Sequence, residues 1–462
     1  MPLLIRGGRL ITATDDYAAD IYCAGETITR IEPGIDPKSL PPGTEIVDAT
    51  GRFVFPGFID PHVHIYLPFM GTFAADDYAS ASRAALVGGT TTLIEMICPG
   101  PADEPWEAFE LWRAKAHGLA AVDYTFHMSV VRFEERVRDQ FRKIVAAGVP
   151  SFKVFLAYKG ALNLTDEHLF AAMKVAQELG VIVTAHCENA DAIDALQKAL
   201  LAAGQTGPEW HGPSRPPVVE ADGVHHLCTF ADLLGTHVYT VHTSCDEAVR
   251  AALAARYRGV NVWIESVIPH LVLDETYAER PDFEGAKYVM SPPLRAKRNQ
   301  EVLWNGVKSR AISTIGTDHA PFSFRGQKDM GKEGFTRIPN GIPSIQERVD
   351  LVHTYGVAQE RLTLNAMVDA CSTQAARLFG LYPKKGAIRI GSDADLVVYD
   401  PAYRGTFSKA ESHSNVDYNA YDGWERLGRA SVVTVRGAIQ ARDGKFVGTI
   451  GRGQFLAREP TH

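Results

Sequence analysis

The sequence predicts an α/β fold: a (β/α)8 barrel of the TIM type with a small β-sandwich domain built from both chain termini. Three observations predict it. Eight apolar runs of strand length recur between residues 53 and 318, helical segments separate them, and short alternating runs fill the two chain ends. Eight strands that alternate with helices favour a closed barrel over an open sheet.

The expected barrel strands follow one another along the middle of the chain. They lie at residues 53–64, 90–98, 123–130, 151–157, 181–188, 237–244, 260–267 and 311–318. Helical segments separate them, such as 166–180, where Leu169, Met173 and Ala176 have helical spacing. Gly180 ends that pattern. We therefore assign residues 53–385 to the barrel.

The two ends of the chain have a different pattern. Residues 1–52 contain short alternating runs broken by Gly and Pro, and residues 386–462 contain similar runs with a hairpin turn expected at Asp443-Gly444. We assign both ends to one small β domain, to which 386–462 also adds a tail. Two connections, 205–222 and 321–343, are longer than a barrel needs, and long ordered loops often shape a pocket.

Composition excludes several classes of protein. The 462 residues are 45% hydrophobic and 22% charged, with a net charge of −8 and no basic run, which argues against disorder and against a nucleic-acid partner. No apolar stretch is long enough to cross a membrane, and the N-terminal residues lack the apolar core of a signal peptide. We expect a cytoplasmic protein with no membrane partner. The six scattered Cys suggest neither disulfides nor a thiolate metal site.

Residues that can bind metal lie at the expected C-terminal ends of the strands. His62 and His64 end the first strand, where residues i and i+2 share a face, although such a pair is a weak signal alone. His186, His242 and Asp318 end the fifth, sixth and eighth strands. Each could instead be a hydrogen-bonded core histidine or a helix cap. Active sites of such barrels are built at these strand ends, so we predict that the five side chains meet.

Lys153 interrupts the apolar strand at 151–157 and faces away from Phe152 and Val154. If that face is the barrel interior, an unpaired ammonium would be very costly, so the lysine must be neutralised, paired or modified. A buried lysine loses its proton readily, and a neutral amine beside metal ions can take up CO2 to become a carbamate with two oxygens. The alternative is an outward lysine covered by helices.

Four imidazoles, one carboxylate and one bridging carbamate suit two divalent ions. Zinc fits these ligands best, with manganese or cobalt as alternatives. A two-metal site activates water and polarises the carbonyl that the water attacks. The sequence therefore predicts metal-assisted hydrolysis of a small-molecule substrate.

Longer motifs surround these residues along nearly the whole chain. They are Phe55-Pro56-Gly57-Phe58-Ile59-Asp60-Pro61-His62-Val63-His64, Ala185-His186-Cys187-Glu188-Asn189, Ser291-Pro292-Pro293-Leu294-Arg295 and Gly316-Thr317-Asp318-His319-Ala320-Pro321. In this order they closely resemble the cyclic amidohydrolases of the D-hydantoinase and dihydropyrimidinase family. The resemblance implies ring-opening hydrolysis of dihydrouracil and 5-monosubstituted hydantoins to N-carbamoyl amino acids, with a preference for the D form, by a homotetramer.

The resemblance also implies roles for the metal ligands. His62 and His64 would hold the more buried ion, His186 and His242 the more exposed one, and carboxylated Lys153 would bridge the two. Asp318 would complete the first site and carry the proton from the attacking hydroxide to the leaving nitrogen. The adjacent His319 points the other way along the strand, so we expect it to support Asp318 at most.

Substrate contacts follow from the same resemblance. Tyr158 matches the tyrosine that donates to the developing oxyanion, and Ser291 and the backbone of Asn340 match the positions that hold the ring amide. The ring substituent would face two loops that supply the apolar side chains of Leu67, Phe69, Met70, Ala161 and Leu162. Lys159 is the one fixed positive charge we expect there, and its flexible stem would carry it to solvent. An apolar, roomy pocket is the expectation.

Other interpretations remain open. Dihydroorotases resemble this chain but usually carry an Arg two residues after the H-x-H motif, where this chain has Tyr66. An allantoinase-type activity is a further cyclic amidohydrolase alternative. Mononuclear deaminases lack the bridging lysine, so Lys153 argues against them. Non-catalytic scaffold homologues lose metal ligands, whereas all six are present here.

Overall fold

Eight parallel strands form a barrel in the computed structural model, which describes residues 2–461. Neighbouring strands pair in chain order. They are β6 (Phe58–Val63), β9 (Thr90–Ile97), β10 (Asp123–Ser129), β11 (Ser151–Phe155), β12 (Ile182–His186), β13 (Val238–Thr240), β14 (Val262–Val267) and β15 (Thr314–Gly316). Backbone hydrogen bonds from Asp318 N to His62 O (3.0 Å) and from His64 N to His319 O (2.8 Å) join the first strand to the segment after the last. The predicted barrel is confirmed.

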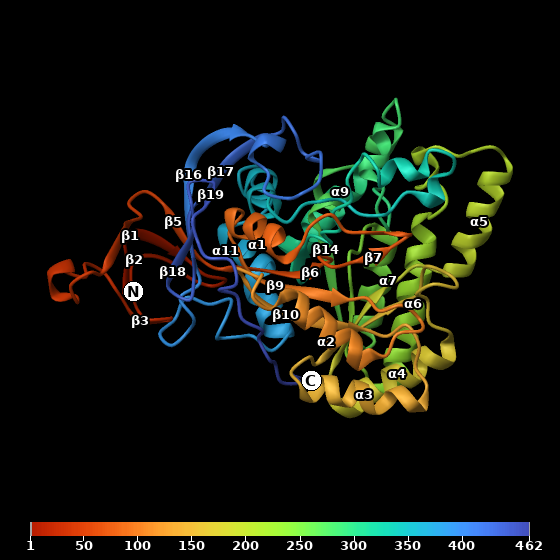
Figure 1. The fold of residues 1–462 in the computed structure, drawn as a ribbon, viewed down its shortest axis with the longest axis horizontal. Helices are drawn as coiled ribbons and strands as arrows, with labels where there is room; N and C mark the ends of the chain where they lie inside the picture. The colour runs from red at the N-terminus through yellow and green to blue at the C-terminus, as the bar shows by residue number, and fades with distance from the viewer. Residues whose placement is uncertain (1, 462) are drawn as a thin grey trace.

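Helices follow the strands and cover the outside of the barrel (Figure 1). They are α1 (Tyr78–Val87), α2 (Pro105–Ala116), α3 (Glu135–Ala146), α4 (Asp166–Leu179), α5 (Ala190–Ala202), α6 (Pro217–Leu234), α7 (Asp246–Tyr257), α8 (Ile268–Val272), α9 (Arg298–Lys308), α10 (Arg348–Leu351), α11 (Leu364–Val368) and α12 (Gln374–Leu378). Because α6 begins at Pro217, the expected loop at 205–222 is shorter than predicted. Within residues 2–461, no helix has the length and apolar character needed to cross a bilayer.

Helix α4 forms where the spacing predicts a helix. Thr165 caps its first turn by accepting a backbone hydrogen bond, and Gly180 ends it in a left-handed conformation with φ 64°. Leu169, Met173 and Ala176 are buried against the rest of the core. The predicted helix over 166–180 is therefore confirmed.

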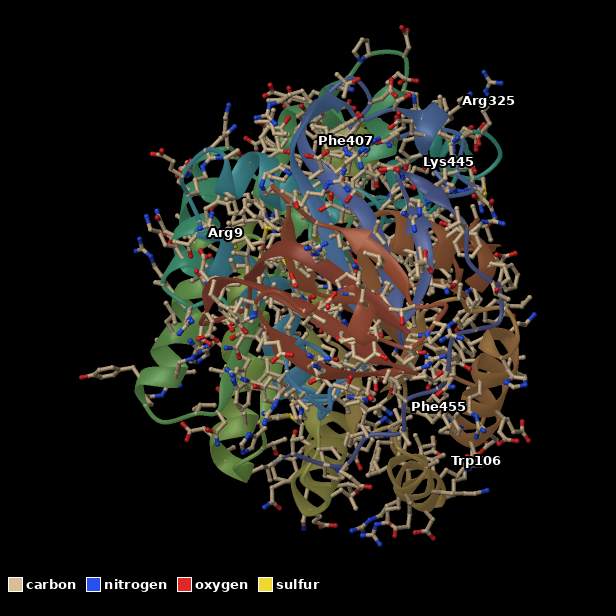
Figure 2. The ribbon with its side chains drawn as sticks, turned by 90° about the vertical axis from the view of Figure 1, so that its left-hand side faces the viewer. Arg9, Trp106, Arg325, Phe407, Lys445 and Phe455 are labelled. Atoms are coloured by element: carbon tan, nitrogen blue, oxygen red, sulfur yellow. The ribbon has the colours of Figure 1, made fainter. Side chains whose placement is uncertain are left out.

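Both chain ends join in one mixed sheet beside the barrel, at the left of Figure 1 and facing the viewer in Figure 2. Its strands are β1 (Leu3–Ile11), β2 (Asp16–Ala24), β3 (Thr27–Glu32), β4 (Glu45–Asp48), β5 (Phe53–Pro56), β16 (Leu396–Thr406), β17 (Glu425–Val435), β18 (Ala438–Arg442) and β19 (Lys445–Phe446). Asp443 and Gly444 turn the chain between β18 and β19 with φ of 48° and 78°. Positive values at both positions are what a two-residue hairpin requires.

One predicted strand is wrong, because residues 53–64 form two strands in two different sheets. β5 pairs with β1 and β16 in the mixed sheet, whereas β6 pairs with β9 in the barrel. Gly57 lies between them and packs so closely that a Cβ there would lie 2.1 Å from Thr91 Oγ1. Both strands are buried, so the hydrophobic pattern does not show that the chain passes from one sheet to the other at Gly57. We propose Gly57, rather than the junction after residue 52, as the boundary of the barrel.

Candidate active site

The six candidate metal ligands converge at the C-terminal end of the barrel. One cavity is lined by all of them, namely His62, His64, Lys153, His186, His242 and Asp318. Each side chain is buried, with no residue more than 8% exposed. The structure therefore brings together residues that are up to 256 positions apart in the chain.

Two groups of ligands are visible inside this cluster. His62 Nε2 and His64 Nε2 each lie 3.1 Å from Asp318 Oδ1, which is close enough for the three side chains to share one ion. The rings of His186 and His242 form the second group, with centroids 4.4 Å apart. His242 also lies 5.3 Å from His62 between ring centroids, so the two groups are neighbours.

Two of these ligands have strained backbone conformations just beyond the ends of their strands. β13 ends at Thr240 and β15 at Gly316, so both strands are shorter than predicted, and His242 and Asp318 follow two residues beyond them. Both residues have positive φ, 38° and 51°. Non-glycine residues adopt this conformation at a cost, and such strain is concentrated at functional sites.

Lys153 lies inside the barrel, as strand parity suggests. Its side chain is 1% exposed and Nζ lies 5.1 Å from the centre of the Phe155 ring, while Phe152 and Val154 pack in the outer core. Burial lowers the pKa of Lys153 to about 8, although the carboxylates of nearby acids oppose this shift. Part of the population is therefore a neutral amine near neutral pH.

Two buried glutamates, for which no role was predicted from the sequence, orient the imidazoles. Glu265 Oε2 lies 2.9 Å from His62 Nδ1 and accepts a hydrogen bond from His242 N at 3.1 Å. Glu188 Oε2 lies 2.6 Å from His186 Nε2. Carboxylates in this position fix the tautomer and orientation of a metal-binding histidine. The signal was present, because Glu265 interrupts an apolar strand just as Lys153 does.

The donor set fits a divalent metal. His242 Nδ1 is a buried nitrogen for which the described residues supply no hydrogen-bond partner. Buried polar atoms without a partner are rare and costly, and a cation between the imidazoles would supply one. Imidazole and carboxylate donors are those that zinc and similar divalent ions take.

The charges of the cluster depend on one another. Burial alone would lower the pKa of His62, but the carboxylates of Glu265 and Asp318 outweigh it and raise the pKa to about 9. Burial alone would raise the pKa of Asp318, but the imidazoles of His62 and His64 hold it well below its usual value. The metal-free cluster therefore keeps a proton on His62, which a metal ion must displace.

We expect metal affinity to rise steeply with pH across the neutral range. A bound ion must displace the proton of His62, with a pKa of about 9, and that of Lys153, with a pKa of about 8. Below both values, each displaced proton changes the apparent association constant about tenfold per pH unit. Calorimetric zinc titrations in buffers of different ionisation enthalpy count the released protons. An affinity that does not change with pH would contradict this protonation pattern.

Three predicted substrate contacts line the same cavity as the ligands. Tyr158 follows β11 with φ 64°, and its ring lies 5.4 Å from that of Phe69 and 5.2 Å from that of His186. Asn340 Nδ2 donates to Ser291 Oγ at 2.9 Å. Burial raises the pKa of Tyr158 to about 12, so its hydroxyl remains a hydrogen-bond donor at neutral pH.

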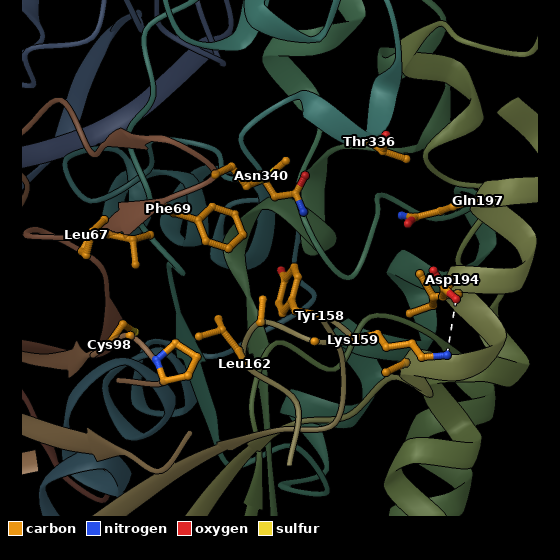
Figure 3. Close-up of a pocket in the computed structure, with 18 of the residues that line it drawn as sticks. Leu67, Phe69, Cys98, Tyr158, Lys159, Leu162, Asp194, Gln197, Thr336 and Asn340 are labelled. Carbon is orange, nitrogen blue, oxygen red and sulfur yellow. Dashed lines mark hydrogen bonds and ion pairs between the residues drawn. The ribbon is translucent and has the colours of Figure 1, made fainter. Parts of the chain in front are cut away.

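A second cavity of about 610 Å³ adjoins the cluster and shares Leu67, Phe69 and Tyr158 with the first. Figure 3 shows side chains that line it. The apolar residues expected there all line it, namely Leu67, Phe69, Met70, Ala161 and Leu162. Lys159 lies at its rim and pairs with Asp191 at 2.6 Å. The expectation about Lys159 covered only the two loops, and a second cation, Arg215, lines the cavity from the long connection after α5. Sequence spacing could not show where that connection folds.

His319 faces away from the metal cluster. Its Nε2 lies 3.0 Å from Asp76 Oδ2, and its Nδ1 accepts a hydrogen bond from Ser344 N at 3.1 Å. His319 therefore holds the loop after β15 in place, next to Asp318 in sequence.

A parallel barrel with four imidazoles, an aspartate and a lysine at its C-terminal end defines a metal-dependent hydrolase. The chain belongs to the amidohydrolase family, whose model matches residues 53–439. It is 44% identical over 459 residues to the D-hydantoinase of Geobacillus stearothermophilus, covering 99% of this chain and 97% of that relative. It is 37% identical over 441 residues to the dihydropyrimidinase of Arabidopsis thaliana, covering 95% and 82%. The solved D-hydantoinase (dihydropyrimidinase) of a Thermus species superposes with a TM-score of 0.97 at 57% identity and covers 99% of both chains.

Proposed function

We propose that this enzyme hydrolyses the cyclic amide bond of dihydrouracil and of neutral 5-monosubstituted hydantoins. The products would be N-carbamoyl amino acids, with a preference for the D form. The observation that carries the proposal is the convergence of six ligand residues in one cavity, next to a larger and mainly apolar cavity that shares Leu67, Phe69 and Tyr158 with it. The activities named for the full-length relatives support the same substrate class.

The proposed cofactor is a pair of divalent ions, zinc first, with manganese or cobalt as alternatives. Lys153 would bridge them as a carbamate: its neutral Nζ bonds to the carbon of CO2 and one proton is released. When bound, such a pair supplies an acidic water and polarises the scissile carbonyl. His62, His64 and Asp318 would hold one ion, and His186 and His242 the other.

The residues of the chain carry the proton and hold the ring. A carboxylate of Asp318 would accept the proton of the attacking water and deliver it to the ring nitrogen as the C–N bond breaks. The Tyr158 hydroxyl would donate to the carbonyl oxygen as negative charge develops there. Ser291 and the backbone of Asn340 would hold the ring amide, which leaves the substituent facing Leu67 and Phe69.

The cavity disfavours an acidic ring. Both cations that line it are already ion-paired, Arg215 with Glu188 at 2.5 Å and Lys159 with Asp191 at 2.6 Å. The carboxylate of dihydroorotate would therefore find no uncompensated positive charge. We further propose a homotetramer located in the cytoplasm, which rests on the sequence and on the family resemblance.

An alkyl series of substrates tests the proposed function. Each buried methylene contributes about 0.8 kcal/mol, so kcat/KM of metal-loaded enzyme should rise about fourfold per methylene from hydantoin upward until the cavity is full. Dihydrouracil should be hydrolysed, and dihydroorotate should be a poor substrate. If dihydroorotate were the best substrate, the proposal would be wrong. Loss of the D preference alone would remove only the stereochemical part.

A further inference from the structure

Two buried side chains of the connection between α5 and α6 contact the predicted substrate-binding groups. His211 and Arg215 are each 3% exposed, and both line the outer cavity. They follow a short turn at Pro208–Trp210 and precede α6. Neither residue is a candidate metal ligand, so their burial at the cavity wall needs another explanation.

Arg215 lies against the ring of Tyr158. Its guanidinium carbon is 5.4 Å from the ring centre, a distance at which a cation is attracted by the face of an aromatic ring. The ion pair with Glu188 holds the Arg215 side chain in place. A hydrogen bond from the Arg295 side chain to Arg215 O holds its backbone. A positive charge this close to the ring draws electron density from the phenol, which makes the Tyr158 hydroxyl a stronger donor.

His211 controls which way the Ser291 hydroxyl points. His211 Nε2 lies 2.8 Å from Met290 O and 3.2 Å from Ser291 Oγ. A carbonyl only accepts, so Nε2 carries the proton; burial lowers the pKa of His211 to about 3 and keeps the ring neutral. Ser291 Oγ also accepts from Asn340 Nδ2. Neither nitrogen can accept in return, because each carries its own hydrogen, so the hydroxyl hydrogen of Ser291 points away from both and can donate elsewhere.

We propose that His211 and Arg215 are positioning residues for the substrate: Arg215 holds and polarises Tyr158, and His211 fixes Ser291 as a hydrogen-bond donor toward a ring carbonyl. This inference rests on the proposed function, because it requires Tyr158 and Ser291 to contact the substrate. It also explains why one connection of the barrel is long, since that connection supplies both residues.

A double-mutant cycle tests Arg215. Arg215→Lys keeps the charge and removes the planar face, so we expect kcat for a 5-alkyl hydantoin to fall about tenfold with little change in KM. In a Tyr158→Phe background the same change should cost less than about twofold. Arg426→Lys is the matched control, because Arg426 is also buried and pairs with Asp350 at 2.6 Å, away from the cavity. Its effect should be equal in both backgrounds.

Folding and metal content are measured for each variant by circular dichroism and metal analysis. If Arg215→Lys loses metal, the double-mutant cycle is repeated with Arg215→Gln, because the glutamine amide can still donate a hydrogen bond to Glu188. Loss of metal in both variants would assign Arg215 to the metal site and overturn the inference. Equal effects of Arg215→Lys with and without Tyr158 would overturn it as well.

A KM measurement tests His211. His211→Phe keeps the ring shape and removes the donor, so KM should rise about tenfold with a smaller change in kcat, and His211→Asn should restore part of the loss. Neither should change KM further in a Ser291→Ala background. An unchanged KM, or an additive effect, would contradict the role. Wild-type turnover of hydantoins is measured first: without it the proposed function fails together with the inference, whereas additive cycles on an active wild type overturn only the inference.

Discussion

Replacing Lys153 with alanine is expected to lower kcat/KM by more than about 100-fold and to release most of the bound metal. Removing a residue that only hydrogen-bonds to a metal ligand typically lowers metal affinity or activity about 10- to 100-fold. Removing a group that bridges two ions should lower them further. Lys153 is buried, with a pKa lowered to about 8, and lies in the cavity lined by the histidines. A short carboxylic acid added to Lys153→Ala should restore part of the activity, because it supplies the two oxygens that the carbamate would provide.

Lys328→Ala is the matched control for Lys153→Ala. Lys328 is also fully buried, and its Nζ donates to Val289 O at 2.9 Å and Pro339 O at 3.1 Å, away from the metal ligands. We expect its metal content to equal that of the wild type. NMR of protein prepared with isotope-labelled bicarbonate should show a carbamate that Lys153→Ala lacks. A structure of the metal-loaded wild type with an unmodified Lys153 amine would exclude the bridge.

Replacing Asp318 with asparagine should lower kcat by at least about 100-fold, the usual scale for loss of general acid–base catalysis. The amide keeps an oxygen for a metal ion but cannot carry a proton at the pH of the reaction. The other buried carboxylates of the cluster cannot take over, because Glu265 is held by His62 and Glu188 by Arg215. The fold should persist, which circular dichroism will show.

Glu265→Gln separates proton transfer from metal binding. The amide oxygen of Gln can still accept from His62 Nδ1, but the loss of negative charge should weaken metal affinity about 10- to 100-fold. Excess zinc should therefore restore most of the kcat of Glu265→Gln and leave Asp318→Asn inactive. Near-normal kcat in metal-saturated Asp318→Asn would show that another group moves the proton.

The sequence by itself determined the barrel and the positions of its candidate ligands. Strand parity and strand ends are local properties, so the pattern around Lys153 was enough to place its side chain opposite Phe152 and Val154. The structure shows that this face is the barrel interior. The convergence of His186, His242 and Asp318 followed from one rule, that parallel strands of a barrel end at the same face. The hairpin at Asp443-Gly444 likewise followed from residues that tolerate positive φ.

Only the tertiary structure decided which buried polar groups pair with one another. Glu265 meets His62 across 203 positions of the chain, and Arg215 reaches Tyr158 from a connection without regular pattern. The chain crossing at Gly57 could not be predicted for a similar reason. Hydrophobicity indicates that β5 and β6 are both buried, but it does not indicate that they belong to different sheets. Periodicity depends on neighbours in sequence, whereas the partner of a buried charge depends on how distant segments pack. That packing is settled by the free energy of the whole chain.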